Sequence, residues 1–353
     1  MIRNPLIPAA AILAAACFAC VPPPSSGPVL VGASVASSAT CNPGNFQSKV
    51  SYLTTAFQPR LGASRPPTGA LPNPSGAPDY AADLGKAYCA ASDAFRQQLD
   101  SLDYVYINAV ACAASADCFA ESWGWRRSQT TGGPQRIIAL SSGFWTGPHP
   151  RAAYSVYETD LAESILPPST GVSFQNANVD DFATTLVAAL AHEMAHIRYY
   201  DLVGSNPANY CSNKFYNTVW NQPVQPPPAW RRLLTLTERD YLRSHGQWPN
   251  SHKSPPHFAD IDHPGLGGTP RNQLIFQLLA QSQPWASLFA ATAPDEDFIE
   301  TYKFKVLTTA VNPLKSVVIS IAGITNTANI VADYVGGYKT DLATKVGCIP
   351  NSL

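Results

Sequence analysis

The sequence has 353 residues, of which 45% are hydrophobic and 13% are charged, and its formal net charge is −1. A chain of this length and hydrophobicity can bury a substantial core, which excludes a disordered protein and allows one large domain or two lobes. The near-zero net charge argues against binding to nucleic acid or to an anionic membrane surface. We therefore expect partners to be recognised through shape and local chemistry.

Residues 1–20 are typical of an export signal. Arg3 precedes a short apolar run that begins at Leu6 and ends in small residues. This run is too short to span a bilayer, and no later stretch reaches membrane-spanning length without charges or prolines. We expect a signal peptide, secretion to the extracellular space and no membrane span. The alternative is a bacterial lipoprotein with a lipid anchor at Cys17 or Cys20.

Residues 21–40 are rich in Pro, Ser, Ala and Gly, which predicts an irregular leader before a folded domain at residues 41–353. Six of the eight cysteines lie in that domain, an even number that is compatible with three disulfides in an exported protein. Fifteen pairings are possible, and a bond between Cys41 and Cys348 would join the two ends of the domain. The absence of a C-x-x-C pair there argues against a zinc site built from cysteines.

The first elements expected in the domain are two helices and a strand. A helix is expected from about Val50 to Phe57, and a longer one in the segment that begins at Ala81 and follows Asp79. The segment Asp103–Cys112 alternates in the manner of a half-buried strand.

A hairpin and a long helix are expected next. Strands in residues 122–128 and 135–142 flank the turn residues TTGGP. Residues 182–200 contain neither Pro nor Gly and have a helical apolar surface, with Asp180 or Asp181 as N-cap. A further helix is expected at residues 231–245, after proline-rich loops.

The long helix contains the sequence HEMAH, which is an H-E-x-x-H motif. His192 and His196 are four residues apart, so their imidazoles lie on one helix face and can bind one zinc ion, with Glu193 beside it. Only seven His and seven Glu occur in the chain, so random placement would give this motif roughly a few times per thousand such chains. The alternative is a buried helix whose histidines bond to the backbone, although such groups are costly to bury without a function.

The order of strand, hairpin and motif helix resembles the zincin metallopeptidases over about residues 136–200. Residues 135–145 resemble the edge strand that pairs with extended substrate, and residues 183–197 resemble the active-site helix. The resemblance implies an α+β fold. A small twisted sheet and the active-site helix would form an upper lobe at about residues 41–205, and a mostly helical lower lobe would occupy about residues 206–353.

A catalytic zinc site usually has three protein ligands and an open position for water. The metzincin pattern would need Gly at position 199 and His at position 202, where this chain has Tyr199 and Leu202. The metzincin class is therefore excluded. In the gluzincin class the third ligand is a Glu from a later helix.

Residues 294–307 are the best candidate for that later helix. Asp295 can cap it, and Glu296 and Glu300 then lie on one face. The segment resembles the E-x-F-x-E segment of gluzincins, which implies Glu296 as the third zinc ligand and Glu300 as a residue that hydrogen-bonds a ligating His from behind. Glu300 as the ligand is the second choice, and a solvated acidic helix face is the alternative without a function.

Further His and Asp residues cluster on a proline-containing loop between the two motifs. His257 and His263 are candidates for stabilising an oxyanion, with surface histidines as the alternative. Asp260 or Asp262 could ligate zinc as in aspzincins, although the GTxDxxYG pattern of that group is absent.

The resemblance implies a secreted endopeptidase with one catalytic zinc ion and a protein or peptide substrate. Glu193 would be the general base that takes a proton from a zinc-activated water. The alternative is a non-catalytic protein that keeps the fold for binding or for surface interaction.

Overall fold

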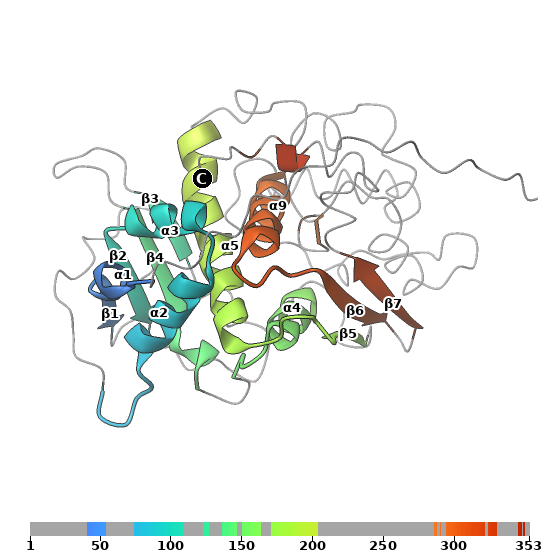
Figure 1. Cartoon of the computed structure of the whole chain (residues 1–353), viewed down its shortest axis with the longest axis horizontal. Helices are drawn as coiled ribbons and strands as arrows, with labels where there is room; N and C mark the ends of the chain where they lie inside the picture. The colour runs from blue at the N-terminus through green and yellow to red at the C-terminus, as the bar shows by residue number, and fades with distance from the viewer. Residues whose placement is uncertain are drawn as a thin grey trace, which may run out of the picture. The chain divides into compact units, whose positions relative to one another are not determined.

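A computed structural model of the chain describes residues 41–53, 74–108, 123–126, 136–146, 150–163, 171–203, 286–287, 290, 294–321, 324–329, 345–347 and 349. Residues 42–353 form one compact unit. Its described part combines helices with two small sheets (Figure 1). No helix in the described ranges is long and apolar enough to cross a membrane.

The first sheet has four strands in the order β1-β2-β4-β3. They are β1 (Val50–Leu53), β2 (Tyr104–Asn108), β3 (Trp123–Arg126) and β4 (Arg136–Ser141). The first three in the sheet order run parallel, with Val105 of β2 opposite both Val50 and Ile138. β3 pairs antiparallel with β4. Parallel neighbours need a crossover connection, which helices between β1 and β2 provide.

Three short helices lie near β1 in the sequence. α1 (Gly44–Gln47) precedes β1, and α2 (Tyr80–Ala90) and α3 (Asp93–Asp100) lie between β1 and β2. The sequence predicts one long helix over the last two, but the backbone is extended at Ala91. Ser92 then caps α3 by accepting a hydrogen bond from the Phe95 amide. Asp79 caps α2 by accepting from the Ala82 amide at 3.0 Å. α2 and α3 therefore each have their own N-terminal cap.

The expected strands fare better than the first expected helix. The helix predicted from about Val50 is wrong over residues 50–53, because these residues pair with β2 as a parallel strand. The strand predicted within Asp103–Cys112 is confirmed as β2, but it is not half-buried: residues 105–108 are all buried. β2 has a parallel neighbour on each side, and parallel strands are usually covered on both faces. The predicted hairpin is confirmed as β3 and β4.

The 3₁₀ helix η2 (Ser142–Phe144) follows β4, and the longer helices are α4 (Tyr154–Glu163), α5 (Phe182–Val203) and α9 (Pro294–Thr309). The helix predicted over residues 182–200 is confirmed as α5. Its N-cap is Asp181, whose carboxylate accepts from the Thr184 amide at 2.7 Å. Asp180 instead accepts from the backbone amide and the hydroxyl of Ser155. The start of α5 is thereby joined to α4.

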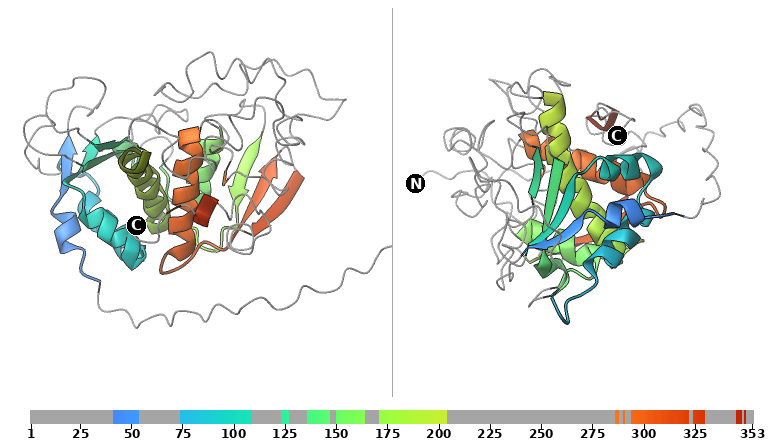
Figure 2. Two further views of the ribbon diagram at one scale, coloured as in Figure 1. Left: turned by 90° about the horizontal axis from the view of Figure 1, so that it is seen from above. Right: turned by 90° about the vertical axis from the view of Figure 1, so that its left-hand side faces the viewer.

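α5 packs against β3, β4 and α2, and it lies side by side with α9 (Figures 1 and 2). Its buried residues include Leu186, Leu190 and Ile197. The contact with α9 is partly aromatic, with the ring centroids of Tyr199 and Phe298 5.4 Å apart. Apolar packing therefore brings two segments together that are far apart in the sequence.

The second sheet is antiparallel, in the order β5-β6-β7. Its strands are β5 (Val172–Gln175), β6 (Ser316–Ile321) and β7 (Ile324–Asn329). The lower lobe is expected from the sequence to be mostly helical, and its described part also contains the hairpin of β6 and β7. Neither this hairpin nor β5 is predicted from the sequence.

Cys41 and Cys89 form a disulfide. This pairing excludes the bond between Cys41 and Cys348 that would join the ends of the domain. The other cysteines and the helix expected at residues 231–245 lie outside the described residues.

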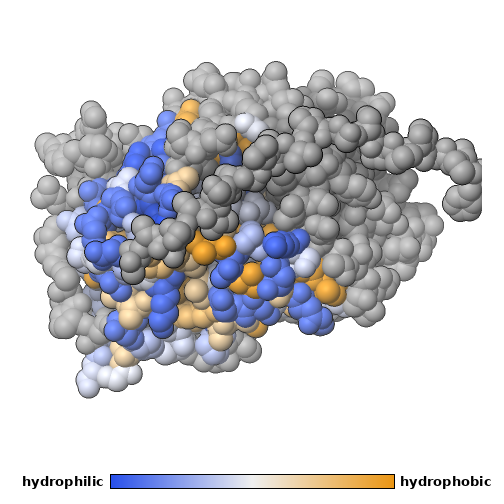
Figure 3. Space-filling view, in the orientation of Figure 1, coloured by the Kyte–Doolittle hydropathy of each residue, from blue (hydrophilic) through white to orange (hydrophobic). Residues whose placement is uncertain are grey.

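The face of the molecule in Figure 3 carries hydrophilic side chains with smaller apolar areas between them. Among the described large hydrophobic residues, Val156 and Val311 are the exposed ones. The apolar side chains of the described elements are thus largely used in packing.

Candidate metal centre

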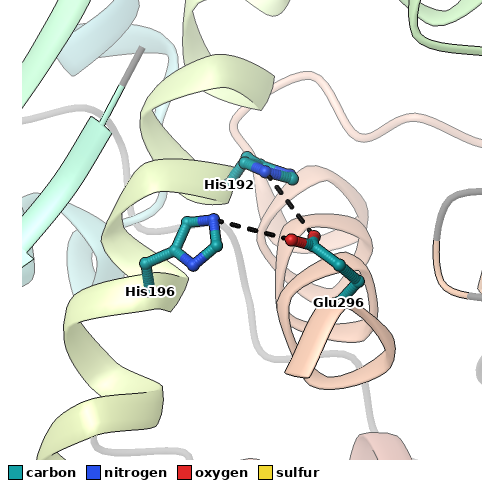
Figure 4. A group of neighbouring side chains, drawn as sticks. All are labelled: His192, His196 and Glu296. Atoms are coloured by element: carbon teal, nitrogen blue, oxygen red, sulfur yellow. Dashed lines mark ion pairs between the residues drawn. The ribbon is translucent and has the colours of Figure 1, made fainter. Parts of the chain in front are cut away.

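The two histidines of HEMAH lie one turn apart on α5, with ring centroids separated by 5.2 Å. Their spacing places both on the helix face that looks toward α9 (Figure 4). The His192 side chain is 11% exposed and that of His196 is 33% exposed. The intervening Met194 and Ala195 are buried in the core. The pair therefore extends from the interior toward solvent.

Glu296 lies opposite these histidines, in the first turn of α9 (Figure 4). Its Oε2 is 3.9 Å from His192 Nε2, and its Oε1 is 4.0 Å from His196 Nε2. α9 begins at Pro294, so the expectation that Asp295 is its N-cap is wrong. Proline suits the first helical position because its missing N–H would have no partner there.

The three residues each offer one ligand atom, and these atoms lie within 4.8 Å of one another. Around a tetrahedral zinc ion with bonds of about 2.0–2.1 Å, ligand atoms are about 3.3 Å apart. Two imidazole nitrogens and one carboxylate oxygen form the donor set of many catalytic zinc sites. The residues therefore fit a zinc ion after a small inward movement of their side chains.

Glu300 is fully buried behind His192, one turn after Glu296. Its Oε1 is 2.9 Å from His192 Nδ1. Burial would raise the pKa of Glu300, but the Lys303 ammonium and the bond to His192 lower it, to about 2. An ionised carboxylate only accepts hydrogen bonds, so Nδ1 is the donor, and in the neutral imidazole the lone pair is then on Nε2, which faces Glu296. This is the tautomer that a metal ion requires.

Glu193 is buried and follows His192 directly on α5. Burial raises the pKa of Tyr157 well above its ordinary value, and the charges of Glu158, Glu300 and Glu193 add to the shift. Glu193 is therefore close enough to α4 to act electrostatically on this phenol.

Three residues near the site were not identified from the sequence. Ser287 and Lys303 both donate to Glu300 Oε2, at 2.5 Å and 2.8 Å. Glu158 of α4 accepts from Lys303 at 2.8 Å. The i,i+3 spacing of Glu300 and Lys303 is a sequence signal for their contact. Ser287 and Glu158 have no such local signal.

The expectation that residues 135–145 form the edge strand is wrong, because β4 is not at the edge of the sheet. β4 lies between β2 and β3, whereas β3 pairs with β4 alone among the described strands. β3 also lies against α5. The described strand at this edge, beside the motif helix, is therefore β3.

His257 and His263 lie outside the described residues, as do Asp260 and Asp262. Their suggested roles at an oxyanion or at zinc stay predictions.

Comparisons with protein-family models, with curated proteins and with solved structures found no match to this chain.

Proposed function

We propose that this protein is a zinc-dependent endopeptidase with a zincin-like α+β fold. The observation that carries the proposal is the convergence of His192, His196 and Glu296 from two helices, with their ligand atoms within 4.8 Å of one another. The hydrogen bond from His192 Nδ1 to Glu300 supports it further, because it leaves Nε2 available to a metal ion.

His192, His196 and Glu296 would hold the zinc ion. When bound, zinc supplies Lewis acidity that lowers the pKa of a water and polarises a peptide carbonyl. Three protein ligands leave a fourth position for that water. The exposure of the His196 side chain supports access from solvent.

Glu193 is the proton carrier in this proposal. It neighbours a ligand in the sequence, and its carboxylate would take the proton of the attacking water and return it to the leaving amine.

β3 offers a place for an extended peptide. Its unpaired edge among the described strands can add a substrate strand through backbone hydrogen bonds, a general mode of peptide recognition. We also propose that the protein is secreted, since residues 1–20 are typical of an export signal and the disulfide of Cys41 with Cys89 suits an oxidising compartment. A lipid anchor at Cys17 or Cys20 is the alternative.

The test is the zinc content of purified protein together with cleavage of an unfolded, alkylated protein, with and without a chelator. We expect one zinc per chain and chelator-sensitive cleavage. Glu193→Gln should keep zinc but lose activity by about 10²–10⁴-fold, the range for removal of a general base. Glu296→Ala should lose zinc as well.

Asp93→Asn is the matched control, because its side chain is 84% exposed on α3 and lies outside the proposed site. It should keep both zinc and cleavage. Full activity of Glu193→Gln would overturn the mechanism, and stoichiometric zinc in Glu296→Ala would move the third ligand elsewhere. Zinc binding without any cleavage by the wild type would favour the non-catalytic binding protein.

A further inference from the structure

A chain of buried polar groups continues from the metal centre to α4. Glu300 contacts His192 on one side and Lys303 on the other, and Lys303 contacts Glu158 of α4. The side chains of Glu300 and Lys303 are 0% exposed, and that of Glu158 is 3% exposed. Three ionisable groups are thus packed away from water, with Lys303 within hydrogen-bond distance of both carboxylates.

Each oxygen of Glu300 has a separate task. Oε1 is 2.9 Å from His192 Nδ1. Oε2 accepts from Lys303 Nζ at 2.8 Å and from the Ser287 hydroxyl at 2.5 Å. Ser287 is itself held, because its hydroxyl oxygen accepts from the Ala290 amide. The carboxylate is therefore fixed in plane by partners on the side away from the histidine.

Lys303 is held equally firmly. Its ammonium donates to Glu158 and Glu300 and lies 5.6 Å from the ring centroid of Tyr157 and 5.1 Å from that of Phe304. Burying one lysine with two carboxylates is costly unless each charge has a close partner. The carboxylate of Glu158 alone would be enough for an ion pair between α4 and α9. The second carboxylate, that of Glu300, is the one that contacts His192.

We propose that Lys303 is a positioning residue of the metal centre, which holds the Glu300 carboxylate against His192 Nδ1 so that His192 presents Nε2 to the metal. Glu158 balances the second charge and joins this arrangement to α4. The inference rests on the proposed zinc site and extends it by a residue that is no part of the H-E-x-x-H motif. Partners behind a ligating histidine typically change metal affinity by 10–100-fold.

The experiment measures zinc affinity by competition with a chromophoric chelator at neutral pH. Lys303→Met replaces the ammonium by an apolar group of similar length, and we expect zinc to bind about 10–100-fold more weakly. Glu158→Gln is the matched control, because it breaks the same buried ion pair but leaves Lys303 on Glu300. It should change zinc affinity by less than about threefold. Equal losses in the two variants would overturn the proposal.

Lys303→Met leaves two buried carboxylates without their cation, so its fold needs a rescue. The double variant Lys303→Met with Glu158→Leu removes the second carboxylate and restores an apolar contact between the helices. We expect it to fold and still to bind zinc weakly. Wild-type zinc affinity in the double variant would show that Lys303 only neutralises Glu158, which would overturn the proposal.

A spectroscopic readout on the wild type separates positioning from general stability. The His192 Nδ1 proton should give a downfield NMR signal in the metal-free protein, assigned by its loss in His192→Gln, and this signal should disappear in the double variant. Its persistence there would contradict the proposal. Absence of zinc binding by the wild type would instead overturn the proposed function, so the two failures are distinguishable.

Discussion

α5 and α9 meet at the candidate metal centre, and apolar packing holds both helices, but their buried charges differ. α5 is buried through apolar side chains such as Leu186 and Leu190. α9 buries three charged residues completely, Asp297, Glu300 and Lys303. The histidines are thus placed by packing, whereas Glu296 is placed by a helix whose position depends on matched charges in addition to apolar packing.

This difference predicts which substitutions the site tolerates. Apolar packing is non-directional, and a core can absorb a lost methyl group while its helix stays in place. A buried ion pair has no such latitude, because removal of one partner leaves an uncompensated charge. Substitutions on the side of α9 should therefore change metal binding more than substitutions in the core of α5.

The largest effect is expected from Lys345→Met. Lys345 is buried and forms an ion pair with Asp297, the neighbour of Glu296. Removal of the ammonium should lower the free energy of unfolding by about 3–5 kcal/mol. It should also weaken zinc binding. Denaturant unfolding and chelator competition measure the two effects.

The double variant Lys345→Met with Asp297→Leu serves as control. Replacing a buried pair by apolar residues is often neutral or stabilising. Most of the lost stability should therefore return. A single variant as stable as the wild type would contradict the view that charges position α9.

A smaller effect on the site is expected from Leu186→Ala, six residues before His192 on α5. Leu186 is fully buried, so the cavity should cost about 3 kcal/mol of stability. Zinc affinity of the folded protein should nevertheless stay within about threefold of the wild type, because the ends of α5 remain anchored. A tenfold weaker zinc affinity would remove the distinction between the two helices.

The smallest effect is a pH dependence of the metal-free protein. The pKa of Glu300 is lowered from 4.5 to about 2, so its contribution to stability is present above pH 4.5 and is lost as the pH falls toward 2. Glu300→Gln should therefore be less stable than the wild type near pH 6, and the two should converge in acid. Urea unfolding at a series of pH values, with a chelator, checks this. If the difference in the free energy of unfolding between the two proteins were independent of pH, ionisation of Glu300 could not be its cause.

The pKa of Asp297 is shifted in the opposite direction to that of Glu300. Burial raises it to about 7, although the Lys345 ammonium acts to lower it. This carboxyl is common to the wild type and to Glu300→Gln. Its contribution therefore cancels in the comparison.

The sequence predicted the motif helix well because its signals are local. His192 and His196 lie on one helix by spacing alone, and the cap at Asp181 is read from neighbouring residues. Glu296 was reached through resemblance, and its geometry beside the histidines depends on the packing of α5 against α9.

Non-local pairings were harder to predict. The sequence predicts a helix at Val50–Leu53, whereas the structure has a strand there. The parallel partner of this strand lies more than fifty residues away, so no local pattern indicates the pairing. The contact of Lys303 with Glu158 joins residues separated by 145 positions. The break between α2 and α3 is a local feature. Ala91 and Ser92 do not interrupt the spacing of apolar residues, so the only sequence signal for the break is Ser92 as the N-cap of α3.

The attachment of residues 345–349 to α9 has a consequence for protein synthesis. Lys345 binds Asp297, and Lys305 donates to the carbonyl oxygens of Val346 and Ile349. A nascent chain emerges from the ribosome with α5 long before these residues. The histidines would then exist without a firmly held Glu296 until the last of these contacts forms. We expect the growing chain to lack the complete proposed metal centre until then.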